Sequence, residues 1–174
     1  MIAGPEMSAE TIEAYDAGSE KIARHLDQGR DVALLCLGDP LLYGSFTGIF
    51  SRLAERFKVE IIPGIASPCA AAAAARTPLA TRNENFSIIP APLDDAAILK
   101  KLESSDTAAI IKIGRHFERI RNLLRKMDLA ENARYIAHAS TKEEYVAPLE
   151  SVSPDKISYF AMILLEKKKT MSAK

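Results

Sequence analysis

The chain of 174 residues has no excess of charge of either sign. Its 23 Lys and Arg residues balance 23 Asp and Glu residues, so the formal net charge is zero. Proteins that bind nucleic acids or anionic membrane surfaces usually carry a basic excess. The balance therefore predicts no nucleic-acid partner and no membrane partner, although it leaves room for a local basic pocket.

Metal ligands and long apolar runs are also scarce. The only two cysteines, Cys36 and Cys69, and the three histidines show no spacing typical of zinc, so no metal is expected. Both cysteines lie in apolar or Ala-rich surroundings, which predicts buried free thiols. No apolar run is long enough to span a bilayer, and the first residues lack the features of a signal peptide. We therefore expect a cytoplasmic protein.

Three common catalytic or nucleotide-binding patterns are absent from the chain. There is no G-x-G-x-x-G and no G-x-x-x-x-G-K-[ST], so the Rossmann and P-loop folds lack their phosphate-binding glycines. Neither His116 nor His138 has a Ser or Cys nucleophile at a recognisable spacing, which argues against a catalytic triad. No pair of carboxylates stands out either, so the sequence names no catalytic residue.

The segments that are present alternate between helical and strand patterns, which predicts an α/β fold with largely parallel strand pairing. A polar, proline-broken stretch at 77–85 predicts a domain boundary, with an N-terminal α/β domain at 1–81 and a C-terminal α/β domain at 82–174. Helices are expected over 8–28, 45–56, 67–76, 94–102 and 116–127. Strands are expected over 32–37, 59–62, 86–90, 108–113, 134–139, 145–149 and 159–165.

Four of the predicted strands end in loops of small or polar residues. These loops are Gly38-Asp39-Pro40, Pro63–Ser67, Ile113–Arg115 and His138–Thr141. In open α/β sheets, ligands bind just past the carboxyl ends of the strands, and glycine lets the backbone approach a ligand closely. We therefore expect the functional site at these loops.

The roles of Asp39 and of the basic residues near the strand ends can each be interpreted in more than one way. Asp39 could be a ribose ligand, a cap or a turn former, and an Asp before Pro more often hydrogen-bonds its own turn. Lys112 and Arg115 flank Gly114 at a strand end, which is a setting suited to an anionic group. Arg119 is expected on a solvated face.

Two motifs of the chain resemble those of a known protein family. Gly38-Asp-Pro-Leu-Leu-Tyr-Gly-Ser45, and Val59-Glu-Ile-Ile-Pro-Gly-Ile-Ala-Ser67 followed by an Ala-rich helix, are similar to the tetrapyrrole (corrin/porphyrin) methylases. The downstream segments look like the precorrin-2 C(20)-methyltransferase branch of that family. These segments are Ile110–Arg115, Tyr135–Thr141, Val146–Leu149 and Tyr159–Leu164, and the resemblance runs from about Ser19 to Leu165.

The resemblance implies two α/β domains with a cleft between them, S-adenosyl-L-methionine as cofactor, and a homodimer. It implies methyl transfer to C20 of precorrin-2 or cobalt-precorrin-2 in cobalamin biosynthesis, within porphyrin-type metabolism. The implied cofactor-binding residues are Gly38, Asp39, Pro40, Leu42, Ala66, Ser67, Pro68, Ile111, Lys112, Ile113, His138, Ala139, Ser140, Ala161 and Met162. Because the substrate carries several carboxylates, Arg82, Lys112 and Arg115 are candidate anchors, with Tyr43 as a further substrate contact.

The chain departs from the family pattern at three places. Ala66 stands where the family usually has Thr, and Ile111 stands where this branch commonly has Met. Family members open with a strand and a loop rich in glycine and proline, and Met1–Pro5 is too short to supply them. We therefore expect a first domain that is incomplete at its N-terminus. Two alternatives follow: an inactive fragment kept as a folded cofactor-binding or dimerisation module, and a methylase acting on another corrin carbon.

Overall fold

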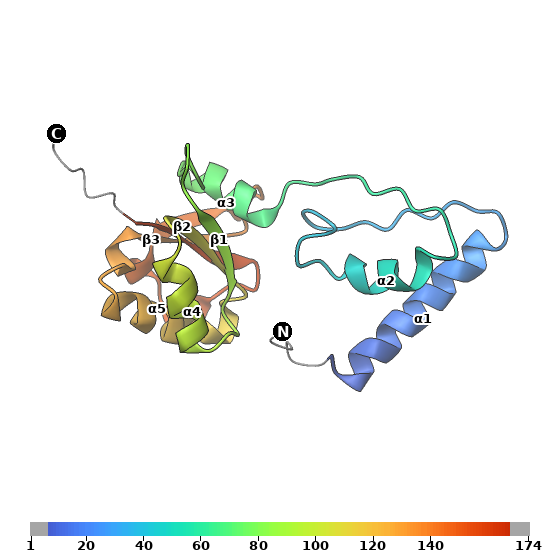
Figure 1. The fold of residues 1–174 in the computed structure, drawn as a ribbon, viewed down its shortest axis with the longest axis horizontal. Coiled ribbons are helices and arrows are strands. Elements are labelled where there is room, and N and C mark those ends of the chain that lie inside the picture. The colour runs from blue at the N-terminus through green and yellow to red at the C-terminus, as the bar shows by residue number, and fades with distance from the viewer. Residues whose placement is uncertain (1–6, 168–174) are drawn as a thin grey trace. The chain divides into compact units, whose positions relative to one another are not determined.

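The computed structural model describes residues 7–167, and the chain divides into two compact units. The first unit ends at Ala66 and the second begins at Ser67 (Figure 1). The opening residues Met1–Pro5 lie outside the described residues. The predicted boundary between residues 81 and 82 stays a prediction.

The first unit contains two packed helices, α1 (Ala9–Leu26) and α2 (Phe46–Leu53). The hydroxyl of Ser8 caps α1 by accepting a hydrogen bond from the backbone N–H of Thr11 at 3.3 Å. Gly48 lies against the ring of Tyr15, and a Cβ on Gly48 would come within 2.7 Å of that ring. The absent side chain therefore allows the two helices to approach each other closely. Both helices confirm the sequence prediction, with α2 shorter than expected.

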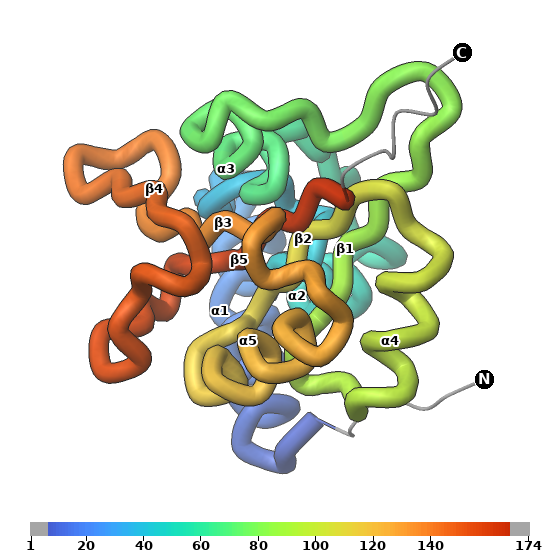
Figure 2. The backbone as a smooth tube through the Cα atoms, turned by 90° about the vertical axis from the view of Figure 1, so that its left-hand side faces the viewer, coloured from blue at the N-terminus to red at the C-terminus, as the bar shows by residue number. Residues whose placement is uncertain are grey.

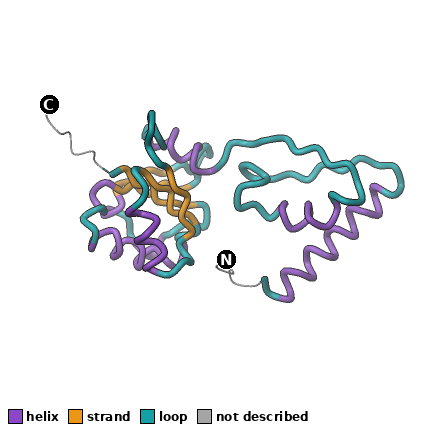
Figure 3. Tube along the Cα trace, in the orientation of Figure 1, coloured by secondary structure: helices purple, strands orange, loops and turns teal. Residues whose placement is uncertain are grey.

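The two strands predicted in the first unit are not formed. Residues 32–37 and 59–62 have no strand assignment in the described part of the unit (Figure 3). Leu35 is 92% exposed, Leu37 88% and Ile62 77%. An apolar run becomes a buried strand only where neighbouring strands supply hydrogen bonds and packed layers cover its faces. Among the described residues of this unit, neither is supplied, so the prediction of buried parallel strands was wrong here.

The second unit holds a five-stranded sheet with helices on both faces (Figures 1 and 2). The strands are β1 (Phe86–Pro90), β2 (Thr107–Ile111), β3 (Ala133–Ala137), β4 (Tyr145–Pro148) and β5 (Ala161–Glu166). The α-helices are α3 (Ser67–Ala75), α4 (Asp95–Glu103) and α5 (Phe117–Lys126). Short 3-10 helices are η1 (Gly114–His116), η2 (Ala130–Asn132), η3 (Leu149–Ser151) and η4 (Pro154–Lys156).

The strand order is β1-β2-β5-β3-β4, and the pairing is mostly antiparallel. Only β1 and β2 pair in parallel, while β5 runs antiparallel to both β2 and β3, and β4 runs antiparallel to β3. The prediction of largely parallel pairing was wrong, because the connection at 138–144 is too short for a parallel crossover and because β5 inserts between β2 and β3. The carboxyl ends of β1, β2 and β3 therefore share one edge with the amino ends of β4 and β5, here called the carboxyl edge.

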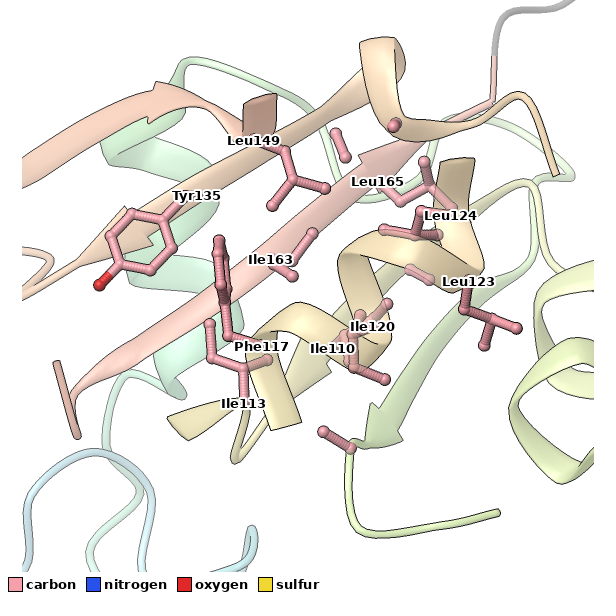
Figure 4. Close-up of a cluster of buried hydrophobic side chains, with 14 of the residues drawn as sticks. Ile110, Ile113, Phe117, Ile120, Leu123, Leu124, Tyr135, Leu149, Ile163 and Leu165 are labelled. Carbon is pink, nitrogen blue, oxygen red and sulfur yellow. The ribbon is translucent and has the colours of Figure 1, made fainter. Parts of the chain in front are cut away.

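The hydrophobic core of the second unit lies on the two faces of this sheet. On the side of α4 and α5, Phe117 and Ile120 of α5 point toward Tyr135 and Ile163 of the strands (Figure 4). On the other side, Ala71 of α3 packs with residues of β2, β3 and β5. The small alanine side chains let α3 lie close to the sheet.

Both cysteines are free, and both are exposed. Cys36 lies on the extended segment 32–37 that has no strand assignment, and Cys69 lies on α3 away from the buried Ala71 and Ala75. The prediction of buried thiols was wrong because an apolar neighbourhood in sequence does not fix which face of a segment is covered.

Candidate functional site

In the first unit, the Gly38-Asp39-Pro40 loop is tied to the Pro63-Gly64 loop through one carboxylate. Asp39 Oδ1 accepts a hydrogen bond from the backbone N–H of Leu41 at 2.9 Å. Its Oδ2 accepts one from the backbone N–H of Gly64 at 3.2 Å. The Asp39 side chain therefore forms its own turn, as Asp-Pro sequences favour, and it also holds a second loop 25 residues away.

The backbones of these two loops are in direct contact. A Cβ placed on Gly64 would lie 2.2 Å from the carbonyl oxygen of Gly38, which is too short for any non-bonded contact. Gly38 itself has φ +83°, a left-handed conformation that glycine adopts without strain. The two glycines thus leave a surface lined by main-chain groups, the kind of surface that a ligand can approach closely.

In the second unit, the carboxyl edge brings together the three segments that the sequence assigns to the cofactor. Residues 111–113 follow β2, residues 138–140 follow β3, and Ala161 opens β5 opposite Ala137. The backbone N–H of His138 donates to the carbonyl of Phe160 at 2.9 Å, which closes the gap between two of these segments. Their union at one edge follows from the antiparallel insertion of β5.

Several residues at this edge have an unusual backbone conformation. Lys112, His138 and Ser140 have φ values of +59°, +50° and +65°. Non-glycine residues in the left-handed region are uncommon, and such residues cluster at ligand sites. The backbone N–H of Ser140 donates to the Glu144 carboxylate at 2.7 Å, which fixes the loop in this shape.

The His138 side chain is held on two sides. Its Nε2 lies 2.8 Å from the hydroxyl oxygen of Ser158, and its ring centroid lies 5.8 Å from that of Phe160. The Ser158 oxygen also accepts a hydrogen bond from the backbone N–H of Phe160 at 3.1 Å. Ser158 is a residue that sequence reasoning missed, because no motif links it to a histidine 20 positions earlier.

The basic residues of the site differ in how far they are engaged. Arg82 and Arg115 are exposed, and the Arg115 Nε lies 3.3 Å from Nε2 of His116. Arg119, expected on a solvated face, instead donates to the backbone carbonyls of Ala91 and Leu93 and pairs with the Asp95 carboxylate. It therefore holds the loop that follows β1.

We expect the pKa of His116 to lie below its ordinary value of 6.5. Partial burial disfavours the charged imidazolium, and the positive charges of Arg115 and Arg119 lower the pKa further. The unfolded chain then binds the proton more readily, so stability is lost as the pH falls below 6.5 and is retained above it. An NMR titration of the imidazole protons measures this pKa directly, and a midpoint at or above 6.5 would contradict the expectation.

The structure distributes the predicted site residues over both units. The first unit holds Gly38, Asp39, Pro40, Leu42, Tyr43 and Ala66, and the second holds Ser67, Pro68, Arg82, Ile111, Lys112, Ile113, Arg115, His138, Ala139, Ser140, Ala161 and Met162. Each unit gathers its own loops, while a single site built from both sets stays a prediction. Within residues 7–167, no cluster of three or more His, Cys, Asp or Glu residues is placed to hold a metal ion. The same residues contain no helix long and apolar enough to cross a membrane.

Comparison with models of known protein families identifies the family of this chain. The model of the tetrapyrrole (corrin/porphyrin) methylases matches residues 3–152. The chain belongs to this family. That finding confirms the resemblance seen in the Gly38-Asp39-Pro40 and Pro63–Ser67 motifs.

The chain is also similar to individual curated proteins. The chain is 38% identical over 151 residues to the cobalamin biosynthesis protein CobIJ of Mycobacterium tuberculosis, covering 87% of this chain and 30% of that protein. It is 34% identical to the precorrin-2 C(20)-methyltransferase of a Sinorhizobium species, covering 87% of this chain and 62% of that enzyme. The chain thus spans less than two thirds of the length of these relatives.

The fold also matches a solved methylase. The structure of uroporphyrin-III C-methyl transferase from Thermus thermophilus, complexed with S-adenyl homocysteine, aligns with a TM-score of 0.63. The sequence identity is 21%, and the alignment covers 87% of this chain and 72% of that one. The α/β fold expected of a tetrapyrrole methylase is therefore confirmed.

Proposed function

We propose that this chain binds S-adenosyl-L-methionine and takes part in methyl transfer to C20 of a precorrin-2-type tetrapyrrole in cobalamin biosynthesis. The observation that carries the proposal is the family match over residues 3–152. The 34% identity to an enzyme named precorrin-2 C(20)-methyltransferase supports the position of the methyl group.

The residues at the carboxyl edge suit the adenosine part of such a cofactor. Ala139 and Ala161 are small, and the left-handed residues His138 and Ser140 turn the intervening backbone. Ligand sites are commonly apolar slots with a few well-placed polar groups, including backbone N–H and C=O groups. Main-chain groups of residues 111–113, 138–140 and 161–162 would hold the adenosine, and the Gly38 and Gly64 backbones would hold the methionine part.

The chemistry needs little from acidic, basic or nucleophilic side chains. The cofactor supplies an electrophilic methyl group on a sulfonium sulfur when it is bound. The protein's part is to orient the reacting groups and to exclude water, and orientation lowers a barrier by several kcal/mol. The buried side chains of Ile111, Ile113 and Met162 provide an apolar surround at the carboxyl edge. No residue of the chain is assigned as the base that removes the proton from the methylated ring carbon.

The basic side chains suit the acidic substrate. The carboxylates of a tetrapyrrole would pair with Arg82 and Arg115, with Tyr43 as a further contact. Arg115 is exposed beside the carboxyl edge, and its guanidinium can bind a carboxylate through two parallel hydrogen bonds. The homodimer and the cytoplasmic location that the resemblance implies stay predictions.

Titration calorimetry with S-adenosylhomocysteine tests the cofactor proposal. We expect saturable binding by the folded chain, with one site per chain. The absence of heat at high protein concentration from a sample with native circular dichroism would contradict it. Incubation with methyl-labelled cofactor and precorrin-2 then separates the active enzyme from a binding module, because only the enzyme transfers label above the control without protein. Product analysis identifies the carbon that receives the methyl group.

A further inference from the structure

A cavity of about 420 Å³ lies beside β3 and β4 in the second unit, and it shares only His138 with the segments assigned to the cofactor. Its volume is in the range of small-molecule pockets. Residues of the 3-10 helices η3 and η4 and of the segments that follow them contribute to its lining. The lining includes Tyr135, His138, Tyr145, Ser153, Lys156 and Ser158.

The permanent charge in the cavity lining is positive. Among residues 7–167, Lys156 is the one permanently charged residue of the lining, and no Asp or Glu of these residues lines the cavity. Serine and tyrosine residues of the lining add hydroxyl groups. Such a set of groups attracts an anion and offers hydrogen-bond donors to it, whereas a cation would find no counter-charge.

Three donors in the cavity have no protein partner among residues 7–167. They are the ammonium group of Lys156 and the hydroxyl groups of Tyr145 and Ser153. The other hydroxyls are engaged, since Tyr135 accepts a hydrogen bond from the backbone N–H of Ser158 at 3.1 Å. The cavity therefore combines the engaged hydroxyl of buried Tyr135 with free donors on three exposed residues.

The cavity adjoins the carboxyl edge through His138. His138 is the first residue of the predicted cofactor segment 138–140. Its Nε2 lies 2.8 Å from the hydroxyl oxygen of Ser158, another residue of the cavity lining. The residues that follow Ser158 are exposed aromatics, with Tyr159 89% and Phe160 56% exposed. Their rings pack edge to face with centroids 5.2 Å apart. An unsaturated ring system can pack on such side chains while a substituent enters the cavity.

We propose that this cavity binds a carboxylate side chain of the tetrapyrrole, with Lys156 pairing with the carboxylate and Ser153 and Tyr145 donating to it. The inference rests on the proposed function for the nature of the ligand. It adds a substrate anchor from residues that lie outside every family motif recognised in the sequence. The same arrangement places a substrate group beside His138, the first residue of the predicted cofactor segment 138–140.

Binding of uroporphyrin III, a porphyrin with eight carboxylates, tests this assignment by fluorescence titration. We expect K156Q to weaken binding about fivefold at low salt, the scale of an exposed ion pair, and K156R to retain the wild-type affinity. Salt should reduce the difference between K156Q and wild type. K126Q is the matched control, because Lys126 is an exposed lysine at the end of α5 and outside the cavity lining.

Calorimetry with S-adenosylhomocysteine on the same variants separates the two proposals. The assignment predicts unchanged cofactor binding in K156Q. An affinity for uroporphyrin III that is equal in K156Q and wild type, or absent in wild type, would overturn the carboxylate site. A parallel loss of cofactor binding in K156Q would also overturn it, by assigning the cavity to the cofactor. Failure of the wild-type chain to bind S-adenosylhomocysteine would instead count against the proposed function.

Discussion

Replacing Gly64 with alanine is expected to weaken the binding of S-adenosylhomocysteine at least tenfold. The new methyl group would lie 2.2 Å from the carbonyl oxygen of Gly38, so one of the two loops must move. The carbonyl oxygen of Gly38 belongs to the backbone, so it cannot move aside by a change of side-chain rotamer. Movement would also lengthen the 3.2 Å hydrogen bond from the Gly64 N–H to Asp39. Overpacking costs about 1–3 kcal/mol, and a hydrogen bond about 1 kcal/mol more.

Calorimetry of the wild type and G64A measures this effect. Gly18→Ala in the same unit is the control, because a Cβ there would meet only the side chain of Ile49 at an ordinary 3.5 Å. Gly18 lies within α1, where alanine is the better helix former. We expect G18A to bind like the wild type. Equal affinities for all three proteins would show that the Gly38 and Gly64 loops do not contact the cofactor.

Replacing Phe117 with alanine is expected to lower the free energy of unfolding of the second unit by about 3–5 kcal/mol. The Phe117 side chain is 2% exposed and meets the Tyr135 ring edge to face with centroids 5.9 Å apart. It stands at the start of α5 and points into the largest core cluster (Figure 4). Its removal leaves a cavity between α5 and the sheet that backbone shifts can fill only in part.

Urea denaturation followed by circular dichroism measures the loss. Phe160→Ala is the matched control, because Phe160 is 56% exposed and its removal opens no buried cavity. We expect F160A to lose under about 1 kcal/mol, as is usual for surface substitutions. A loss in F117A no larger than in F160A would contradict the core role of Phe117.

Local sequence signals predicted most helices of this protein. The predicted ranges 94–102 and 116–127 agree with α4 and α5 to within one residue at each end. The Asp94 carboxylate accepts from the backbone N–H of Ala97 at 2.8 Å, as a capping residue should. Strand β1 likewise matches its predicted range, Phe86–Pro90. Such elements can be read from the sequence because their determining contacts are close along the chain.

Sheet pairing could not be read in the same way. The short apolar runs at 32–37 and 161–166 look alike in sequence, yet β5 is a buried central strand and residues 32–37 lie exposed. The difference lies in their partners, since β5 pairs with β2 on one side and β3 on the other. A strand is defined by neighbours from elsewhere in the chain, and no local pattern names them.

The sequence by itself determined the family, the helices and the identity of the loops that carry the candidate site. Only the tertiary structure decided how those loops are held. The Asp39 carboxylate reaches Gly64, and the Ser158 hydroxyl reaches His138, across 25 and 20 positions of the chain. The physical reason is the separation along the chain of the residues that interact. Helix periodicity and capping act over one or two turns, whereas these hydrogen bonds form only after folding has brought distant residues together.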